Sequence, residues 1–164
     1  MWRRSVLLVS FCSFFATSTA SASTATGVLT VQATVISACS VSGGTLAFGT
    51  VNPANGTSSL PSVNLSVTCT MGTTFSVGLG DGANAASGQR RMKGTSQAQY
   101  LSYELYRDVT GTQRFGDTVT SQRVTGQVGL GAAPNLISVY GAIPSGQSAP
   151  SDVYSDTVPI TVYY

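Results

Sequence analysis

The residue types that carry covalent or metal chemistry are scarce in this chain. It has 164 residues, no histidine and three cysteines. Without an imidazole, the Ser–His and Cys–His forms of nucleophilic catalysis are excluded, and transition metals lose their commonest ligand. We therefore expect a protein that is not an enzyme, with no metal, no cofactor and no small-molecule substrate.

The carboxylates are the remaining candidates for chemistry. Two of them could form the acid–base pair of a glycosidase, and this stays open as an alternative. Aspartates in turn-like contexts, however, usually hydrogen-bond to nearby backbone, and a structural role is the simpler expectation. The aspartates in such contexts are Asp81, Asp108, Asp117 and Asp152; the other two carboxylates of the predicted mature chain are Glu104 and Asp156.

Residues 1–22 have the pattern of a secretory signal peptide. Arg3 and Arg4 precede an apolar run over residues 6–16, and Ala20-Ser21-Ala22 forms an A-x-A cleavage site. Cleavage after Ala22 is the prediction, with a short membrane anchor as the alternative. An exported protein follows from it.

Cleavage also changes the charge of the chain. The full sequence has 8 Lys+Arg and 6 Asp+Glu, so loss of Arg3 and Arg4 brings the net charge to zero. This balance argues against nucleic acid as a partner. The basic run Arg-Arg-Met-Lys at 90–93 is expected to be a solvated loop, with contact to an anionic partner as the alternative.

Two cysteines remain after Cys12 leaves with the signal peptide. In an oxidising compartment, Cys39 and Cys69 are expected to form a disulfide. It would close a loop of roughly 31 residues and contribute about 3–4 kcal/mol in the chain-entropy account. Two free reactive thiols are the alternative, although neither cysteine belongs to a C-x-x-C motif.

The elements that must hold these residues are predicted to be β-strands. Apolar and polar residues alternate in several short segments, and turn-forming residues separate them. Glutamate and lysine, which favour helices, occur once each. We expect one all-β domain, a sandwich or a barrel, with a hairpin turn at Asp81-Gly82. The predicted strands cover residues 29–35, 63–67, 75–79, 101–106, 139–143 and 158–164.

The first and last predicted strands lack obvious partners. Residues 27–36 alternate well, but the next segment, 41–50, contains Gly43-Gly44 and is a poor partner. The last strand, 157–164, contains Pro159, which cannot donate to a ladder. The two ends could pair within one chain, or the first strand could complete the sheet of another copy. The residues alone do not choose between these solutions.

Several segments resemble the spore coat protein U domain, the subunit family of archaic chaperone–usher pili. The resemblance covers essentially all of the predicted mature chain, in order. It rests on "CSVSGGTLAFGTVNP", "VNLSVTCTMGTTFSVGLGDG", "RRMKG", "YLSYELYRD", "RFGD", "VYGAIPSGQ" and "VYSDTVPITVYY". One departure is Pro159, which interrupts the last strand.

The resemblance implies an incomplete immunoglobulin-like β-sandwich that is completed by donor-strand exchange. It implies a donor-strand segment at 23–37 and a sandwich domain at 38–164, and it also pairs Cys39 with Cys69. The donor side chains would lie within Gly27–Ile36, and the acceptor edge would be the last strand. The donor residues are Leu29, Val31, Ala33 and Val35; the acceptor residues are Val158, Ile160, Val162 and Tyr164.

The resemblance also implies partners and a location. The partners would be identical or related pilus subunits, a periplasmic chaperone and an outer-membrane usher. The chain would travel through the periplasm to a cell-surface pilus that serves adhesion and biofilm formation. A self-contained secreted spore-coat or matrix protein of the same fold is the alternative.

Overall fold

The computed structural model of the chain describes residues 21–57 and 59–164. Most of the predicted signal peptide, 1–22, thus lies outside the described residues. Within the described residues, strands and one 3₁₀ turn, η1 (Thr120–Gln122), form the regular structure, and no helix is long and apolar enough to span a membrane. The strands are β1 (Cys39–Ser42), β2 (Ser62–Cys69), β3 (Thr74–Leu79), β4 (Arg91–Gly94), β5 (Tyr100–Ser102), β6 (Glu104–Tyr106), β7 (Val124–Val128), β8 (Asn135–Ala142), β9 (Tyr154–Ser155) and β10 (Ile160–Tyr163).

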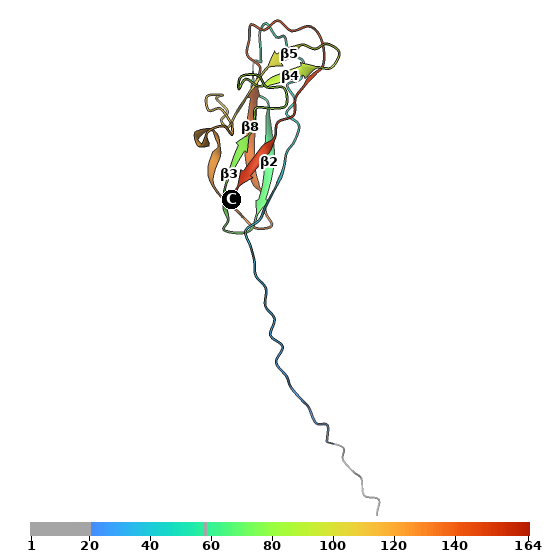
Figure 1. The fold of residues 1–164 in the computed structure, drawn as a ribbon, viewed down its shortest axis with the longest axis vertical. Helices are drawn as coiled ribbons and strands as arrows, with labels where there is room; N and C mark the ends of the chain where they lie inside the picture. The colour runs from blue at the N-terminus through green and yellow to red at the C-terminus, as the bar shows by residue number, and fades with distance from the viewer. Residues whose placement is uncertain (1–20, 58) are drawn as a thin grey trace, which may run out of the picture. The chain divides into compact units, whose positions relative to one another are not determined.

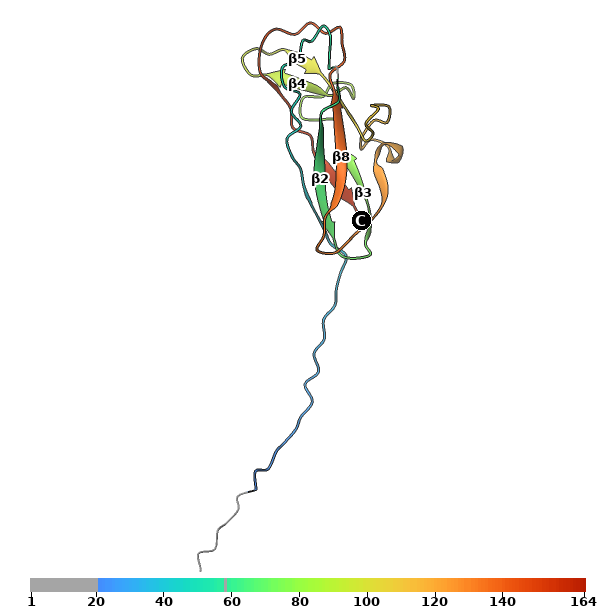
Figure 2. The ribbon, with the colours of Figure 1, turned by 180° about the vertical axis from the view of Figure 1, so that it is seen from behind.

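The strands form two main antiparallel sheets and one small one. The first main sheet has the order β1-β2-β8-β6, and the second has the order β10-β3-β7. The small sheet has the order β5-β4-β9. Figures 1 and 2 show β2 and β8 side by side, with β3 in the other layer. The all-β expectation is confirmed.

The core lies between the two main sheets and follows the period-2 pattern of their strands. In β2, the side chains of Leu65, Val67 and Cys69 are buried, while the residues between them are only partly covered. In β3, Phe75, Val77 and Leu79 are buried in the same cluster. Alternate residues of a strand point to opposite faces, so each main sheet buries one apolar face against the other.

The strand predicted over residues 101–106 is divided at Tyr103. β5 pairs with β4 in the small sheet, whereas β6 pairs with β8 in the first main sheet. Between them, the Tyr103 amide donates to the Arg90 carbonyl at 3.1 Å, and Gln89 Nε2 donates to the Tyr103 carbonyl at 2.9 Å. The buried face of the segment is continuous, so the hydrophobic pattern does not show where its backbone changes partners.

Two expectations for the region after β3 are wrong. β3 and β4 belong to different sheets, so Asp81-Gly82 is not a hairpin turn. The tight turn lies instead at Ser87-Gly88, where both residues have positive φ and Ala86 pairs with Gln89.

The expected solvated loop at 90–93 is also wrong. Residues 91–94 form β4, and the Arg90 side chain is completely buried. A guanidinium can be buried when fixed acceptors surround it, and the sequence pattern gave no sign of them.

Residues 21–38 contain no strand, and nearly all of their side chains are exposed. An extended segment without a neighbour has no ladder to join, so its alternation alone does not produce a strand. The strand expected at 29–35 is therefore not formed among the described residues.

A candidate strand-accepting groove

A large apolar cavity opens between the two main sheets of the sandwich. Its volume is about 1240 Å³, which exceeds the roughly 300–1,000 Å³ of sites for drug-sized ligands. Its apolar floor is formed by core side chains from both main sheets and the small sheet. These are Leu65, Leu79, Met92, Leu101, Leu105, Val139 and Ile143.

One side of this groove is formed by the last strand. β10 is an edge strand, because it pairs with β3 and has no second neighbour among the described strands. Val158 and Ile160 line the groove, whereas Val162 packs against the core without lining it. Two of the predicted acceptor residues, Val158 and Tyr164, lie outside β10, which corrects the expected strand of 157–164.

Pro159 lies opposite Gly80, and its geometry leaves the open edge intact. The Gly80 amide donates to the Pro159 carbonyl at 2.9 Å. In an antiparallel pair of this kind, the N–H that proline lacks would have pointed back toward β3. The next residue, Ile160, lies opposite Leu79. Hydrogen-bonded and non-hydrogen-bonded pairs alternate along an antiparallel ladder, so Ile160 makes no bond to Leu79, and its N–H and C=O point away from β3 toward the groove. The proline therefore interrupts the ladder on the β3 side.

Arg90 takes over the hydrogen bond that Pro159 cannot make. Its Nε and one terminal nitrogen donate to the Gly80 carbonyl at 3.0 and 2.7 Å. The same side chain donates to the carbonyls of Leu79 and Phe115 at 2.9 and 2.8 Å. It also pairs with Glu104, which in turn binds Arg114 at 2.9 Å. This buried cluster holds the end of β3 beneath the groove.

The segment from Gly43 to Val51 forms the other side of the groove. Leu46 and Phe48 pack on the core, and the ring of Phe48 meets that of Tyr103 edge-on at 6.1 Å. Yet the backbone from Gly43 to Val51 makes no hydrogen bond within the described part of the chain. Most residues of this segment are exposed, and only Leu46, Phe48 and Val51 are partly buried. Its backbone groups can therefore pair with an added strand, and the segment is a second open edge.

Gly43-Gly44 explains how this segment approaches the sheets. A Cβ added to Gly44 would come within 2.8 Å of Val63 Cγ2, and one on Gly43 within 3.0 Å of Ile160 Cδ1. The glycines, which made this segment a poor strand partner on sequence grounds, let the backbone lie against β2 and β10. This part of the groove was missed, and close backbone approach is the property of glycine that could have indicated it.

One end of the groove is polar. The Tyr103 hydroxyl donates to Asp156 Oδ2 at 2.7 Å, and the Asn84 amide and side chain donate to Asp156 Oδ1. Burial, together with the neighbouring Asp156 carboxylate, raises the pKa of Tyr103 well above its usual range. The tyrosine stays a neutral donor, so this network is a fixed polar boundary of an otherwise apolar groove.

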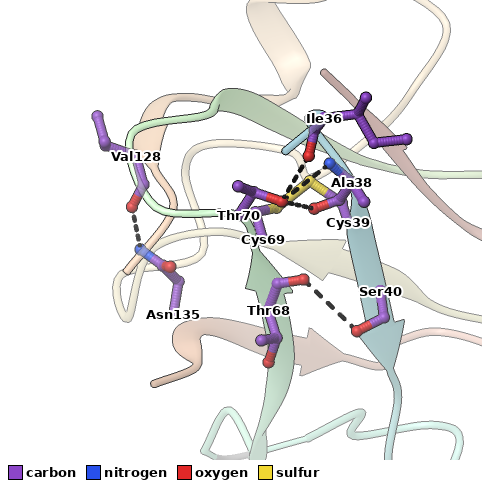
Figure 3. The surroundings of a disulfide bond; sticks show 9 residues. All are labelled: Ile36, Ala38, Cys39, Ser40, Thr68, Cys69, Thr70, Val128 and Asn135. Carbon is purple, nitrogen blue, oxygen red and sulfur yellow. Dashed lines mark hydrogen bonds between the residues drawn. A yellow bond between two sulfur atoms is a disulfide. The ribbon is translucent and has the colours of Figure 1, made fainter. Parts of the chain in front are cut away.

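At the other end of the sandwich, a disulfide joins β1 to β2. Cys39 and Cys69 are opposite each other in the ladder and are bonded, as expected. Thr70 continues this connection: its amide donates to the Ala38 carbonyl at 2.9 Å, and its hydroxyl donates to the Ile36 carbonyl at 3.1 Å (Figure 3). The Ala38 amide donates back to the Thr70 hydroxyl at 3.2 Å.

The predicted donor segment has the side chains that such a groove requires. Leu29, Val31 and Val35 are 85%, 82% and 81% exposed, and Ala33 between them is exposed as well. These residues share one face of an extended chain, opposite Thr30, Gln32 and Thr34.

Four of the aspartates make hydrogen bonds or ion pairs within the domain. Asp108 and Asp152 accept hydrogen bonds from nearby backbone amides, as expected for turns. Asp81 and Asp117 form ion pairs with Arg114 and Arg123 instead. Across residues 21–57 and 59–164, no group of three or more potential ligands could hold a metal ion.

The fold and the groove define the protein as an immunoglobulin-like, all-β sandwich with an open side. The sequence profile of the Spore Coat Protein U domain matches residues 25–161, and the chain belongs to this family. It is 41% identical to Protein U of Myxococcus xanthus, with 93% of this chain and 92% of that protein covered. Membership in this family of structural proteins identifies the chain as a structural protein and not an enzyme.

A solved structure shares the fold. The chain is similar to a chain of the CsuC–CsuE chaperone–tip adhesion subunit pre-assembly complex from the archaic chaperone–usher Csu pili of Acinetobacter baumannii. The TM-score is 0.54 at 19% sequence identity, and the match covers 80% of this chain and 41% of that one. At this identity the likeness concerns the fold.

Proposed function

We propose that the protein is a structural subunit of a secreted chaperone–usher pilus that polymerises head-to-tail by donor-strand exchange. Residues 27–36 of one copy would occupy the groove of the next. The observation that carries the proposal is the apolar groove between two unpaired edges, in a chain that also has an exposed, alternating apolar segment. Addition of the segment as a strand would pair the open edges of the groove and bury the apolar side chains of the segment.

The energetics support a long-lived junction. Leu29, Val31, Ala33 and Val35 would leave water for the groove floor, and each larger side chain contributes about 1.5–3 kcal/mol on burial. Backbone hydrogen bonds to β10 and to the Gly43–Val51 segment would add to this. Because the donor of one copy fills the acceptor of another, the contact is heterologous and generates an open filament.

The remaining parts of the proposal concern export and assembly. Residues 1–22 would direct export, and a periplasmic chaperone would cover the groove until an outer-membrane usher exchanges it for the next donor. The pilus would then serve surface adhesion and biofilm formation. The fold shared with a chaperone–adhesion subunit complex supports the chaperone as a partner.

A self-contained spore-coat or matrix protein is the second candidate. The name of the family favours it. In that case the N-terminal segment would fill the groove of its own chain, and the protein would stay monomeric.

The test compares the mature protein with a variant that lacks residues 23–37. Each is co-expressed with its chaperone, released, and examined by gel filtration and on unboiled SDS gels. The proposal expects ladders of polymers for the intact protein and none for the truncated one. A synthetic peptide of residues 23–37 should bind the truncated protein, and the same peptide with Val31→Asp should not.

A different result would contradict the pilus proposal. If both proteins stay monomeric and the truncated one unfolds at a lower temperature, the segment belongs to its own domain. The pilus proposal would then be wrong, and the coat protein would stand.

A further inference from the structure

The disulfide end of the sandwich carries an exposed apolar surface, which we call the tip. It consists of Met71 in the β2–β3 turn, Val128 at the end of β7, and Leu130 in the β7–β8 turn, with Met71 76% and Leu130 53% exposed. None of these side chains is needed for the core or for the groove.

The tip is a single surface because hydrogen bonds tie its two turns together. The Gly72 amide donates to the Gly129 carbonyl at 3.0 Å, and the Gly131 amide donates to the Cys69 carbonyl at 3.1 Å. Asn135 Nδ2 donates to the Val128 carbonyl at 3.1 Å, beside the disulfide in Figure 3. The apolar side chains are therefore held at one end of the domain.

The N-terminal segment leaves the domain next to this surface. The Thr70 hydroxyl, one residue before Met71, donates to the Ile36 carbonyl and accepts from the Ala38 amide. We call this contact the Thr70 pin. It holds Ile36, which directly follows the donor residue Val35, beside Thr70, and Thr70 directly precedes Met71 of the tip.

We propose that the tip is a contact surface for a second copy of this chain, namely the copy whose groove holds the N-terminal segment. The inference rests on the proposed function. An extended chain advances at most about 3.3–3.6 Å per residue. If Val35 lies in the groove of another copy, Ile36 is the next residue, and its hydrogen bond to Thr70 keeps Thr70 within roughly two residue lengths, about 7 Å, of that groove. Met71 and its neighbours in the tip then lie close enough to that copy to contact it.

Such a contact would do what the donor strand cannot. A single extended segment fixes the distance between two domains but leaves their orientation free. Three apolar side chains beside the pinned residue would bury surface against the neighbour and restrict rotation at the junction. A large exposed apolar side chain such as Met71 is then covered in the polymer.

The test introduces a photo-cross-linking residue, p-benzoylphenylalanine, at Met71 of the mature protein. The matched control carries it at Val109, which is 68% exposed on the loop after β6 and has no link to the N-terminal segment. After polymerisation and irradiation, copy-to-copy adducts are measured on boiled gels and mapped by mass spectrometry. Position 71 should yield several-fold more adducts than position 109, mapped next to the groove of the neighbouring copy.

A second pair of variants tests the pin. Thr70→Val removes the hydroxyl, and Thr70→Ser keeps it. The amount of polymer should be the same for both, while the adduct from position 71 should fall with valine and persist with serine. If polymers form but position 71 yields no more adduct than position 109, the tip is not a contact surface. If the intact protein forms no polymer, both the proposed function and this inference are wrong. The comparison with the truncated protein and the peptide binding test address the proposed function alone, so its failure is distinguished from a failure of the tip contact.

Discussion

Residues 27–36 and β2 have the same alternation of apolar and polar residues but opposite surroundings. In β2, Val67 is completely buried between the sheets and Cys69 is bonded to Cys39. In the N-terminal segment, Val31 is 82% exposed and the backbone belongs to no strand. The pattern identifies a face that requires burial, but it does not say which molecule provides the cover.

The basic run at 90–93 shows the same contrast for charged residues. Arg90 is buried among carbonyls and Glu104, whereas Lys93 is exposed, although the two are three residues apart. The first two predictions below compare a substitution of a buried residue with the same substitution of its exposed counterpart. They run from the largest expected effect to the smallest.

The largest effect is expected for Arg90→Met. It removes the donor to three backbone carbonyls and leaves Glu104 with Arg114 and the Leu105 amide as partners. Breaking a buried ion pair costs about 3–5 kcal/mol, and Lys93→Met should change the free energy of unfolding by less than about 0.5 kcal/mol. Urea denaturation of both variants measures the difference. Equal stability of the two would show that the buried arginine is dispensable.

An intermediate effect is expected for valine-to-alanine changes in the two alternating segments. Val67→Ala removes two buried methyl groups and leaves a cavity, which should cost roughly 2–3 kcal/mol. Val31→Ala should leave the unfolding of the monomer unchanged and lower only the stability of the polymer. Denaturation of the monomer and dissociation of polymers in hot SDS measure the two quantities. A destabilised monomer in Val31→Ala would mean that the segment packs on its own domain.

The smallest effect is expected for Asp152, outside both alternating segments, and it concerns thermal stability at acidic pH. Although partial desolvation acts to raise the pKa of Asp152, hydrogen bonds from the amides of Ser96, Gln97 and Val153 and from the Thr95 hydroxyl lower it to about 2. A carboxyl with a lowered pKa stabilises the fold above its usual pKa of about 3.9. This contribution is lost as the pH falls toward 2. Asp152→Asn should therefore flatten the fall in thermal stability between pH 5 and pH 2.5.

Much of the sandwich could be predicted from the sequence because its strands bury one face each. The expected segments at 63–67 and 75–79 lie within β2 and β3, the segment at 139–143 lies in β8 except for Ile143, and the two cysteines are bonded as expected. Those strands follow from side-chain periodicity, which acts locally along the chain.

The rest depends on contacts between residues far apart in the sequence. The change of sheet at Tyr103, the burial of Arg90 and the open edge at Gly43–Val51 are set by partners that local patterns do not name. Arg90 is the clearest case, because the carbonyl it serves is left without a partner by Pro159, 69 positions away. The groove could not be predicted from the sequence because one of its sides, the Gly43–Val51 segment, forms no regular secondary structure.

The bond between Cys39 and Cys69 has a mechanical consequence. Tension applied through residues 27–36 would first reach the hydrogen bonds of Thr70 to Ile36 and Ala38, and then the disulfide one residue further on. The covalent bond passes that load directly to β2, which is flanked by β1 and β8 in the middle of its sheet. Pulling would thus act on β2 in shear, against its full ladder with β8, rather than peeling the four-residue β1 away one hydrogen bond at a time.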